Sequence, residues 1–242
     1  MGNSHLQFEA CRILIGLLID YLSTALRTYR VGAELNFLYD QDDPSAKVVP
    51  DLYILADEPQ VGPKVPSWKP WEHEGKVPNL VIEVVSDSYR KDYTPEEMPQ
   101  RYERLGVAEL IRYDPDYAGH PRSKYPRRLF SQFLRDKSGA LVERPLAEGA
   151  QQVQLHSFPF WLVHQAPYTL RLAEGAEADG LKLLPTASEV AALAQKDARA
   201  ACERAESEKE RAESEKERAR RAEAEVERLR VELAALRAQA RR

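Results

Sequence analysis

Apolar residues near the start of the chain recur at three- and four-residue steps, the spacing of one face of an α-helix. Six residues form this stripe: Ile13, Leu14, Leu17, Leu18, Tyr21 and Leu22. The spacing predicts a helix over residues 1–28 that buries one face against the rest of the protein.

Short apolar segments separated by turn residues come next, and this pattern predicts β-strands. The segments cover residues 33–39, 48–55, 80–85 and 107–113. The third is rich in β-branched residues, as in strands that are buried on both faces. Residues 59–78 are rich in proline and have few periodic apolar positions, so we predict a long loop there.

A second helix is predicted between the last two of these strands. Thr94 suits the N-cap, Pro95 the first helical position and Gly106 a left-handed C-cap, although Pro99 offers a later start. Strand, helix and strand in this order imply a parallel crossover. Strand-like segments over residues 127–172 suggest an antiparallel extension. The chain is therefore predicted to have an α/β fold, a mixed sheet flanked by helices, over residues 1–186.

The last quarter of the chain follows a seven-residue pattern. The sequence ESEKERA at residues 206–212 is repeated at residues 213–219. Alanine, valine and leucine occupy most seam positions of residues 187–242, but Glu208 and Glu215 interrupt the seam. We predict a helix of about 80 Å that forms a coiled coil and joins two copies in a homodimer. The alternative is a solvated single helix stabilised by ion pairs one turn apart.

Charge is distributed unevenly between these two parts. The chain has 35 Lys and Arg against 39 Asp and Glu, of which 14 and 13 lie in residues 187–242. Residues 1–186 are therefore mildly acidic, which argues against a protein that coats nucleic acid through a strong basic field. An enzyme that meets DNA at a metal site stays possible, because the metal supplies positive charge locally.

The two cysteines, Cys11 and Cys202, lie near opposite ends and have neither metal-ligand nor disulfide spacing. We expect reduced thiols in a cytoplasmic protein. The most apolar run, residues 13–22, is shorter than the ~20 residues that a membrane-spanning helix needs. It also lacks a basic leader and a cleavage site, so we expect neither a membrane segment nor export.

Two carboxylates stand out because each lies inside a predicted strand. An ionised Asp51 or Glu83 in apolar surroundings is costly unless it pairs or binds a cation. On neighbouring strands, the two could hold one Mg²⁺, with Mn²⁺ as a substitute. The alternative is that each lies at a strand edge or meets an arginine.

Several short motifs, in this order and spacing, resemble the Uma-type family of endonucleases, which is restriction-endonuclease-like and belongs to the PD-(D/E)xK superfamily. The motifs are Val49–Leu52, Pro78–Ser86, Asp92, Tyr102, Gly106–Val107, Glu109–Leu110 and Asp114–Pro115. His5 before an apolar helix and residues 168–189 also look like that family, so the resemblance extends from Ser4 to about Glu189.

The resemblance implies that Asp51 and Glu83, helped by the backbone carbonyl of Val84, ligate Mg²⁺ for the hydrolysis of DNA phosphodiester bonds. The superfamily usually places a lysine two residues after the glutamate, where this chain has Val85. The Uma-type family is thought to supply its lysine from the following helix, at the position of Met98. This chain departs from the pattern at both positions.

Three nearby polar residues are candidates to replace the missing lysine: Lys91, Gln100 and Arg101. Each is alternatively a solvated surface side chain. Glu9 and Glu34 are candidates for a second metal, and the basic cluster at residues 122–128 for phosphate contacts or a solvated loop. We predict a Mg²⁺-dependent DNA endonuclease. The alternatives are a nuclease-fold binding or scaffolding module without catalysis, and a protein whose working part is its C-terminal helix.

Overall fold

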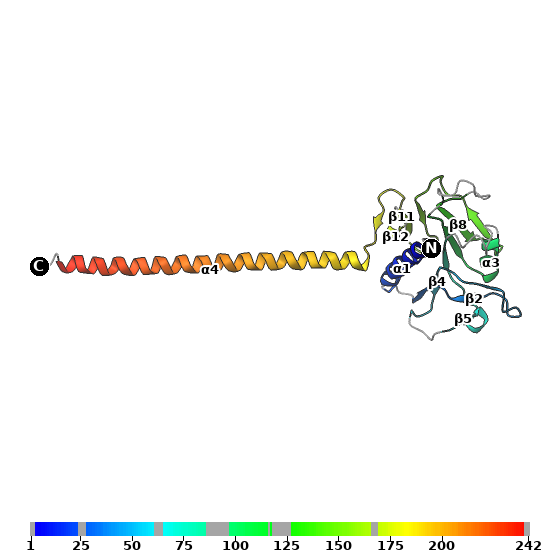
Figure 1. The fold of residues 1–242 in the computed structure, drawn as a ribbon, viewed down its shortest axis with the longest axis horizontal. Coiled ribbons are helices and arrows are strands. Elements are labelled where there is room, and N and C mark those ends of the chain that lie inside the picture. The colour runs from blue at the N-terminus through cyan, green and yellow to red at the C-terminus, as the bar shows by residue number, and fades with distance from the viewer. Residues whose placement is uncertain are drawn as a thin grey trace. The chain divides into compact units, whose positions relative to one another are not determined.

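The computed structural model describes residues 3–23, 28–60, 65–85, 97–115, 117, 127–165 and 169–239. The chain divides into two compact units, Met1–Ala187 and Ser188–Arg242 (Figure 1).

A six-stranded mixed sheet forms the centre of the first unit. Its strand order is β1-β4-β6-β7-β8-β9. The strands are β1 (Tyr29–Gly32), β4 (Leu52–Ala56), β6 (Leu80–Val84), β7 (Glu109–Tyr113), β8 (Phe130–Arg135) and β9 (Leu141–Arg144). β6 and β7 are parallel and the other neighbours are antiparallel. Helix α3 (Glu97–Leu105) connects the parallel pair. The predicted α/β fold with a parallel crossover is therefore confirmed.

One face of this sheet packs against helix α1 (Asn3–Leu22) and a second, four-stranded sheet. The second sheet contains β10 (Gln152–Gln154), β11 (Trp161–Gln165), β12 (Thr169–Glu174) and β13 (Lys182–Leu183). Leucines of α1 meet the even-numbered residues of β4 and β6, such as Leu52 and Ile82, in one apolar core. Burial of this α1 stripe agrees with the periodicity of the sequence.

The opposite face carries α3 and a three-stranded sheet of β3 (Lys47–Val48), β2 (Asn36–Leu38) and β5 (Ser67–Trp68). Odd-numbered residues of β4 and β6, such as Tyr53 and Val81, point to this second core. Even and odd residues separate in this way because successive side chains of a strand alternate between the two faces.

Two predicted elements are wrong in detail. The single strand predicted over residues 48–55 is divided into β3 and β4, which belong to different sheets. Pro50 lies at the division, where it cannot donate a ladder hydrogen bond, and its carbonyl accepts one from the Glu34 N–H at 3.0 Å. The predicted loop at residues 59–78 contains β5 and a short 3₁₀ helix, η1 (Pro70–Glu72). Trp68 of β5 is buried and organises this segment.

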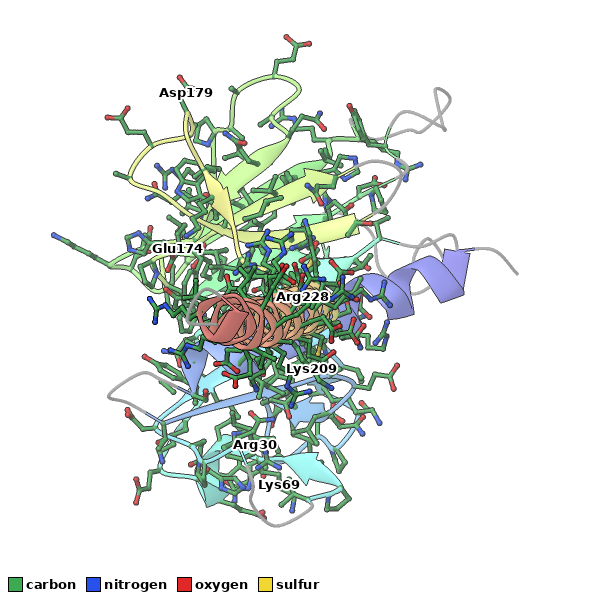
Figure 2. All side chains as sticks on the ribbon, turned by 90° about the vertical axis from the view of Figure 1, so that its left-hand side faces the viewer. Arg30, Lys69, Glu174, Asp179, Lys209 and Arg228 are labelled. Atoms are coloured by element: carbon green, nitrogen blue, oxygen red, sulfur yellow. The ribbon has the colours of Figure 1, made fainter. Side chains whose placement is uncertain are left out.

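The second unit is a single long helix, α4 (Ala187–Gln239). Charged side chains such as Lys209 and Arg228 project outward around it (Figure 2). Ion pairs within the helix include Arg221–Glu217 at 3.0 Å and Arg228–Glu225 at 2.9 Å. Within the described ranges, no helix combines the length and the apolar character needed to cross a membrane.

Candidate active site

The pairing of β4 with β6 brings the two predicted carboxylates together. In this antiparallel pair Leu52 lies opposite Ile82, and Tyr53 opposite Val81. One residue further along the same register, Asp51 comes opposite Glu83. Residues that face each other in this way have Cβ atoms about 5 Å apart. Asp51 and Glu83 are also both odd-numbered, so they share the sheet face that α3 covers.

Direct contacts hold the carboxylate pair. The Val84 N–H donates to Asp51 Oδ2 at 2.8 Å, and the carboxyl groups of Asp51 and Glu83 are hydrogen-bonded to each other. Glu83 is only 6% exposed. Two carboxyl groups in such contact share a proton unless another cation neutralises them. The pair is thus a place where a metal ion would have to replace a proton.

Helix α3 supplies a third member of the site. Met98, Tyr102 and Leu105 are its buried residues, at the spacing of one helical face. The Tyr102 hydroxyl donates a hydrogen bond to Glu83 Oε1. Burial, and secondly the negative charge of Asp51, raise the pKa of Glu83 well above its ordinary value, whereas the Tyr102 hydrogen bond opposes this shift. Burial and the charge of Asp51 therefore favour the protonated form of Glu83 until another cation replaces the proton.

A thiol of helix α1 lies within the electrostatic range of the pair. Burial raises the pKa of Cys11 to about 12, and the negative charges of Asp51, Glu83 and Glu34 add to the shift. Glu34 itself is exposed, with a left-handed φ of 54°. Three carboxylates thus act on one side of α1, although among the described residues no group of three or more His, Cys, Asp and Glu side chains is arranged to hold a metal ion.

The two positions where a lysine was expected are apolar in structure as well as in sequence. The Met98 side chain is 1% exposed and packs in the core with Val81 and Leu110. Val85 follows β6, and its N–H donates to the Tyr113 carbonyl at 2.8 Å. Neither position can present a charged group to the carboxylate pair.

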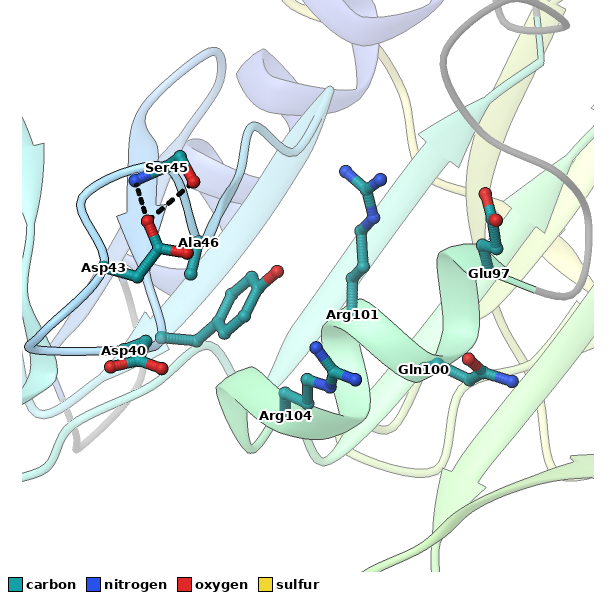
Figure 3. A pocket seen from close by; sticks show the side chains of 9 residues that line it. Asp40, Asp43, Ser45, Ala46, Glu97, Gln100, Arg101 and Arg104 are labelled. Carbon is teal, nitrogen blue, oxygen red and sulfur yellow. Dashed lines mark hydrogen bonds between the residues drawn. The ribbon is translucent and has the colours of Figure 1, made fainter.

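Two of the predicted replacements, Gln100 and Arg101, line a groove of about 760 Å³ (Figure 3). Helix α3 forms one wall with these residues, Glu97 and Arg104. The turn from Asp40 to Ala46 forms the other wall, where Asp43 accepts hydrogen bonds from Ser45. The groove therefore carries charges of both signs.

Other predicted residues fall outside the described ranges or have structural partners. Lys91 and Asp92, the side chains of His5 and Glu9, and residues 122–126 of the basic cluster lie outside the described residues. At the end of that cluster, Arg127 binds Asp114 through two nitrogens at 2.6 and 2.5 Å. Arg128 lies 3.6 Å from Glu143. This part of the cluster is at least partly neutralised.

One cationic residue, Arg112, is aligned with the Asp51–Glu83 pair and was not predicted from the sequence. The parallel register of β6 and β7 aligns Glu83 with Arg112, and the antiparallel register of β7 and β8 aligns Arg112 with Ser131. Arg112 Nη2 donates to Ser131 Oγ at 2.9 Å. Four polar residues thus form a row across four adjacent strands: Asp51, Glu83, Arg112 and Ser131. The alternation of Leu110 and Arg112 indicated a shared face, but the register that aligns Arg112 with Glu83 is not readable from the sequence.

A comparison with protein families places the chain in one of them. Residues 2–163 match the Uma2 family, which is described as putative restriction endonuclease. The chain belongs to the Uma2 family. No match was found among curated proteins. The Uma2 match contains Asp51, Glu83, Tyr102 and Arg112, and it ends before β12 and α4, so the resemblance predicted for residues 164–189 lies beyond it.

Proposed function

We propose that this Uma2 protein is a divalent-metal-dependent endonuclease that hydrolyses phosphodiester bonds of DNA, with Asp51 and Glu83 as metal ligands. One observation carries the proposal: the two carboxyl groups touch each other on one face of the sheet, and one of them is almost fully buried. A shared proton or a metal ion neutralises such a pair, and we propose that the metal ion does so in the active protein.

The donor set suits a hard ion. Mg²⁺ takes oxygen ligands, keeps several waters and is commonly bound by one or two carboxylates together with substrate phosphates. Asp51 and Glu83 provide this minimum, and the Val84 carbonyl is a further proposed ligand. Mn²⁺ accepts the same oxygens. An ion at this position would replace the proton that the two carboxyl groups share in its absence.

When bound, the ion would polarise the scissile phosphate and lower the pKa of a coordinated water. The protein's own groups orient the ligands for this chemistry. The Val84 N–H fixes one oxygen of Asp51, and Tyr102 fixes one oxygen of Glu83. Gln100, Arg101 and Lys91 are proposed to contact the DNA. An arginine is a poor base, so Arg101 would steady a phosphate rather than activate water.

The decisive experiment compares plasmid cleavage by the parent protein, Asp51→Asn and Glu83→Gln in Mg²⁺ and in Mn²⁺. Glu143→Gln, which changes an exposed carboxylate of β9, is purified alongside as the control. Cleavage by the parent and the control, with loss in both site variants, supports the proposal. Equal nicking by all four proteins indicates a contaminating nuclease, and no cleavage by any of them in either metal rejects the proposal.

A second candidate is a nuclease-fold binding or scaffolding module that has lost catalysis. The observation in its favour is the apolar character of Val85 and the burial of Met98, which leave no lysine at either expected position. This candidate predicts that Mg²⁺ binds in isothermal titration calorimetry, and that Asp51→Asn abolishes the binding, without cleavage of DNA by the parent.

We further propose that α4 joins two copies in a parallel coiled coil. Val226, Leu229 and Leu233 occupy seam positions of the heptad and are about half exposed on the isolated helix. In a parallel pair, the residue directly before Ala219, Val226 or Leu233, the first seam position of its heptad, faces the residue five positions later on the partner. From residue 218 onward these contacts join opposite charges: Arg218 with Glu223, Glu225 with Arg230, and Glu232 with Arg237.

Farther toward the start of α4 the same rule joins Arg204 with Lys209 and Arg211 with Lys216, which are like charges. The attractive part is therefore residues 218–239. Leu229→Asp should convert the dimer to a monomer in light scattering, because it places a charge in the seam. Leu193→Asp, an exposed position outside the seam, is the control and should remain dimeric. A monomeric parent protein would contradict the proposal.

A cytoplasmic location is also proposed, because both cysteines are free thiols.

A further inference from the structure

We propose that Arg112 binds a phosphate of the substrate beside the carboxylate pair, and so supplies the positive charge that Val85 and Met98 cannot. This inference rests on the proposed nuclease function and adds to it a substrate-binding residue on strand β7. The lysine that the sequence led us to seek in the helix would thus be replaced by an arginine from the sheet.

The sheet register places Arg112 next to the pair. β6 and β7 are neighbouring parallel strands in which Glu83 and Arg112 are aligned. Neighbouring strands lie about 4.8 Å apart, so Arg112 is one strand beyond Glu83, just as Asp51 is one strand before it. Leu110, two residues earlier, packs in the core under α3. Arg112 therefore emerges on the same face as Asp51 and Glu83.

Ser131 holds the guanidinium without neutralising it. Ser131 is 2% exposed, and its hydroxyl accepts a hydrogen bond from Arg112 Nη2 at 2.9 Å. A guanidinium has five N–H donors, so most of them remain available for another acceptor. Arg112 is half-buried, and among the described residues no carboxylate forms an ion pair with it. Because the hydroxyl of Ser131 is neutral, this hydrogen bond leaves the positive charge of Arg112 for a further ligand.

Other buried or half-buried arginines of this unit have structural roles. Arg127 is bound by Asp114, Arg135 donates to the carbonyls of Val107 and Glu103, and Arg171 donates to the carbonyl of Leu184. Arg112 differs from these three in its strand register, which aligns it with Glu83. This contrast argues that its charge serves a ligand and not the fold.

A phosphate is the ligand that fits best. The planar fork of arginine matches the geometry of two phosphate oxygens, and the guanidinium keeps its charge at any physiological pH. Asp51 and Glu83 would hold a metal ion that supplies a second positive charge to the same phosphate group. The substrate phosphate would then lie between two positive centres, as hydrolysis requires when negative charge develops on its oxygens.

The test measures binding separately from cleavage. Affinity for a fluorescein-labelled DNA duplex is measured by fluorescence anisotropy over a range of salt concentrations, in Ca²⁺, which accepts the same oxygen ligands. The variants are Arg112→Met, Arg112→Lys and Lys137→Gln. The last is the control, since it removes one positive charge at the exposed turn between β8 and β9, at the other end of β8 from Ser131. Thermal melting establishes that each variant is folded.

Loss of one phosphate contact reduces the slope of log affinity against log salt by about 0.9. We expect this reduction for Arg112→Met only, with retention of the parental slope in Arg112→Lys and Lys137→Gln. If a folded Arg112→Met protein kept the parental salt slope and the parental affinity for DNA, the assignment of Arg112 would be overturned. The proposed function would still stand if cleavage depended on Asp51 and Glu83. A parent protein that binds no DNA would overturn both.

Discussion

Tyr102 of helix α3 donates a hydrogen bond from its phenolic hydroxyl to the carboxyl group of Glu83 on strand β6. The contact is buried, and it connects the helix that carries the groove residues to the strand that carries the candidate metal ligand. Because the bond lowers the pKa of Glu83 against the effect of burial, it favours the ionised carboxylate that a metal needs. The phenol therefore acts on the candidate metal site through Glu83.

Removal of this hydroxyl should weaken metal binding. Partners that orient a ligand typically contribute 10- to 100-fold to metal affinity, so we expect Tyr102→Phe to weaken Mn²⁺ binding roughly tenfold or more. The pH at which binding is half-maximal should also rise, since the pKa of Glu83 rises further without the hydrogen bond. Calorimetric titrations at several pH values measure both effects.

Tyr113→Phe provides the matched control for this change. Its hydroxyl is also hydrogen-bonded, to His164 Nδ1 at 2.7 Å, but Tyr113 packs in the core on the α1 face. Each variant should lose about 1 kcal/mol of stability. Only Tyr102→Phe should change metal affinity, and equal metal affinity in the two variants would contradict a positioning role for Tyr102.

Glu83 should make the metal-free protein less stable as the pH rises. The folded state raises its pKa, so between the ordinary glutamate pKa and the raised value the folded protein binds more protons than the unfolded chain. The free energy of unfolding then decreases with increasing pH across this window. The stabilisation is complete below the ordinary pKa and is lost as the pH passes the raised pKa. Urea denaturation in EDTA at a series of pH values measures the slope.

Glu83→Gln cannot titrate and should remove this part of the pH dependence. Its unfolding free energy, subtracted from that of the parent at each pH, isolates the contribution of Glu83. Saturating Mg²⁺ should reverse the trend for the parent, because the ion binds the ionised carboxylates. A difference between parent and variant that does not change with pH would show that burial does not perturb Glu83.

The reactivity of Cys11 should report whether a cation is bound. Its pKa of about 12 leaves very little thiolate near neutral pH, so iodoacetamide should label Cys11 far more slowly than the exposed Cys202. An ion at the carboxylate pair would offset the charges of Asp51 and Glu83, which lowers the pKa of the thiol and accelerates labelling. Peptide mass spectrometry over time gives the rate for each cysteine.

Cys202 provides an internal control for this measurement, since Mg²⁺ should not alter its labelling rate. The double variant Asp51→Asn, Glu83→Gln should label Cys11 at a rate that does not depend on Mg²⁺. If calorimetry demonstrates saturation of the parent with Mg²⁺ while the Cys11 rate is unchanged, the ion does not bind at Asp51 and Glu83.

A second buried glutamate, Glu109 of β7, should be important for stability alone. Its carboxylate accepts hydrogen bonds from the backbone N–H groups of His156 and Ser157 and from Gln132 Nε2, at 2.7–3.0 Å. Hydrogen bonds to charged groups contribute about 1.5–3 kcal/mol each. Glu109→Ala should therefore lower the unfolding free energy by roughly 3 kcal/mol or more. Denaturant titration measures this loss, and unchanged Mg²⁺ affinity in the folded variant would separate Glu109 from the metal site.

Glu83 and Glu109 illustrate which features of the protein could be predicted from the sequence and which could not. Alternation of apolar residues and the turn signals predicted the α/β fold and the crossover helix. The antiparallel contact of β4 with β6, however, depends on long-range pairing that no local pattern encodes. For the same reason the sequence could not distinguish a glutamate that accepts hydrogen bonds from amides from one that faces another carboxylate.

The missed cation has a similar explanation. The predicted replacements for the missing lysine, Lys91, Gln100 and Arg101, are all near Glu83 in sequence. Arg112 is 29 positions from Glu83 and is brought beside it only by the parallel register of β6 and β7. The division of residues 48–55 at Pro50 was missed because each half contains a reasonable strand pattern.

Strand alignment also limits how this protein can change during evolution. Insertions between Ala56 and Leu80 lengthen a connection and leave the facing positions of β4 and β6 as they are. One inserted residue between Asp51 and Tyr53 would instead turn Asp51 toward the leucines of α1. Homologues that retain the chemistry should therefore vary in length between Ala56 and Leu80. They should keep the spacing between Asp51 and Tyr53 unchanged.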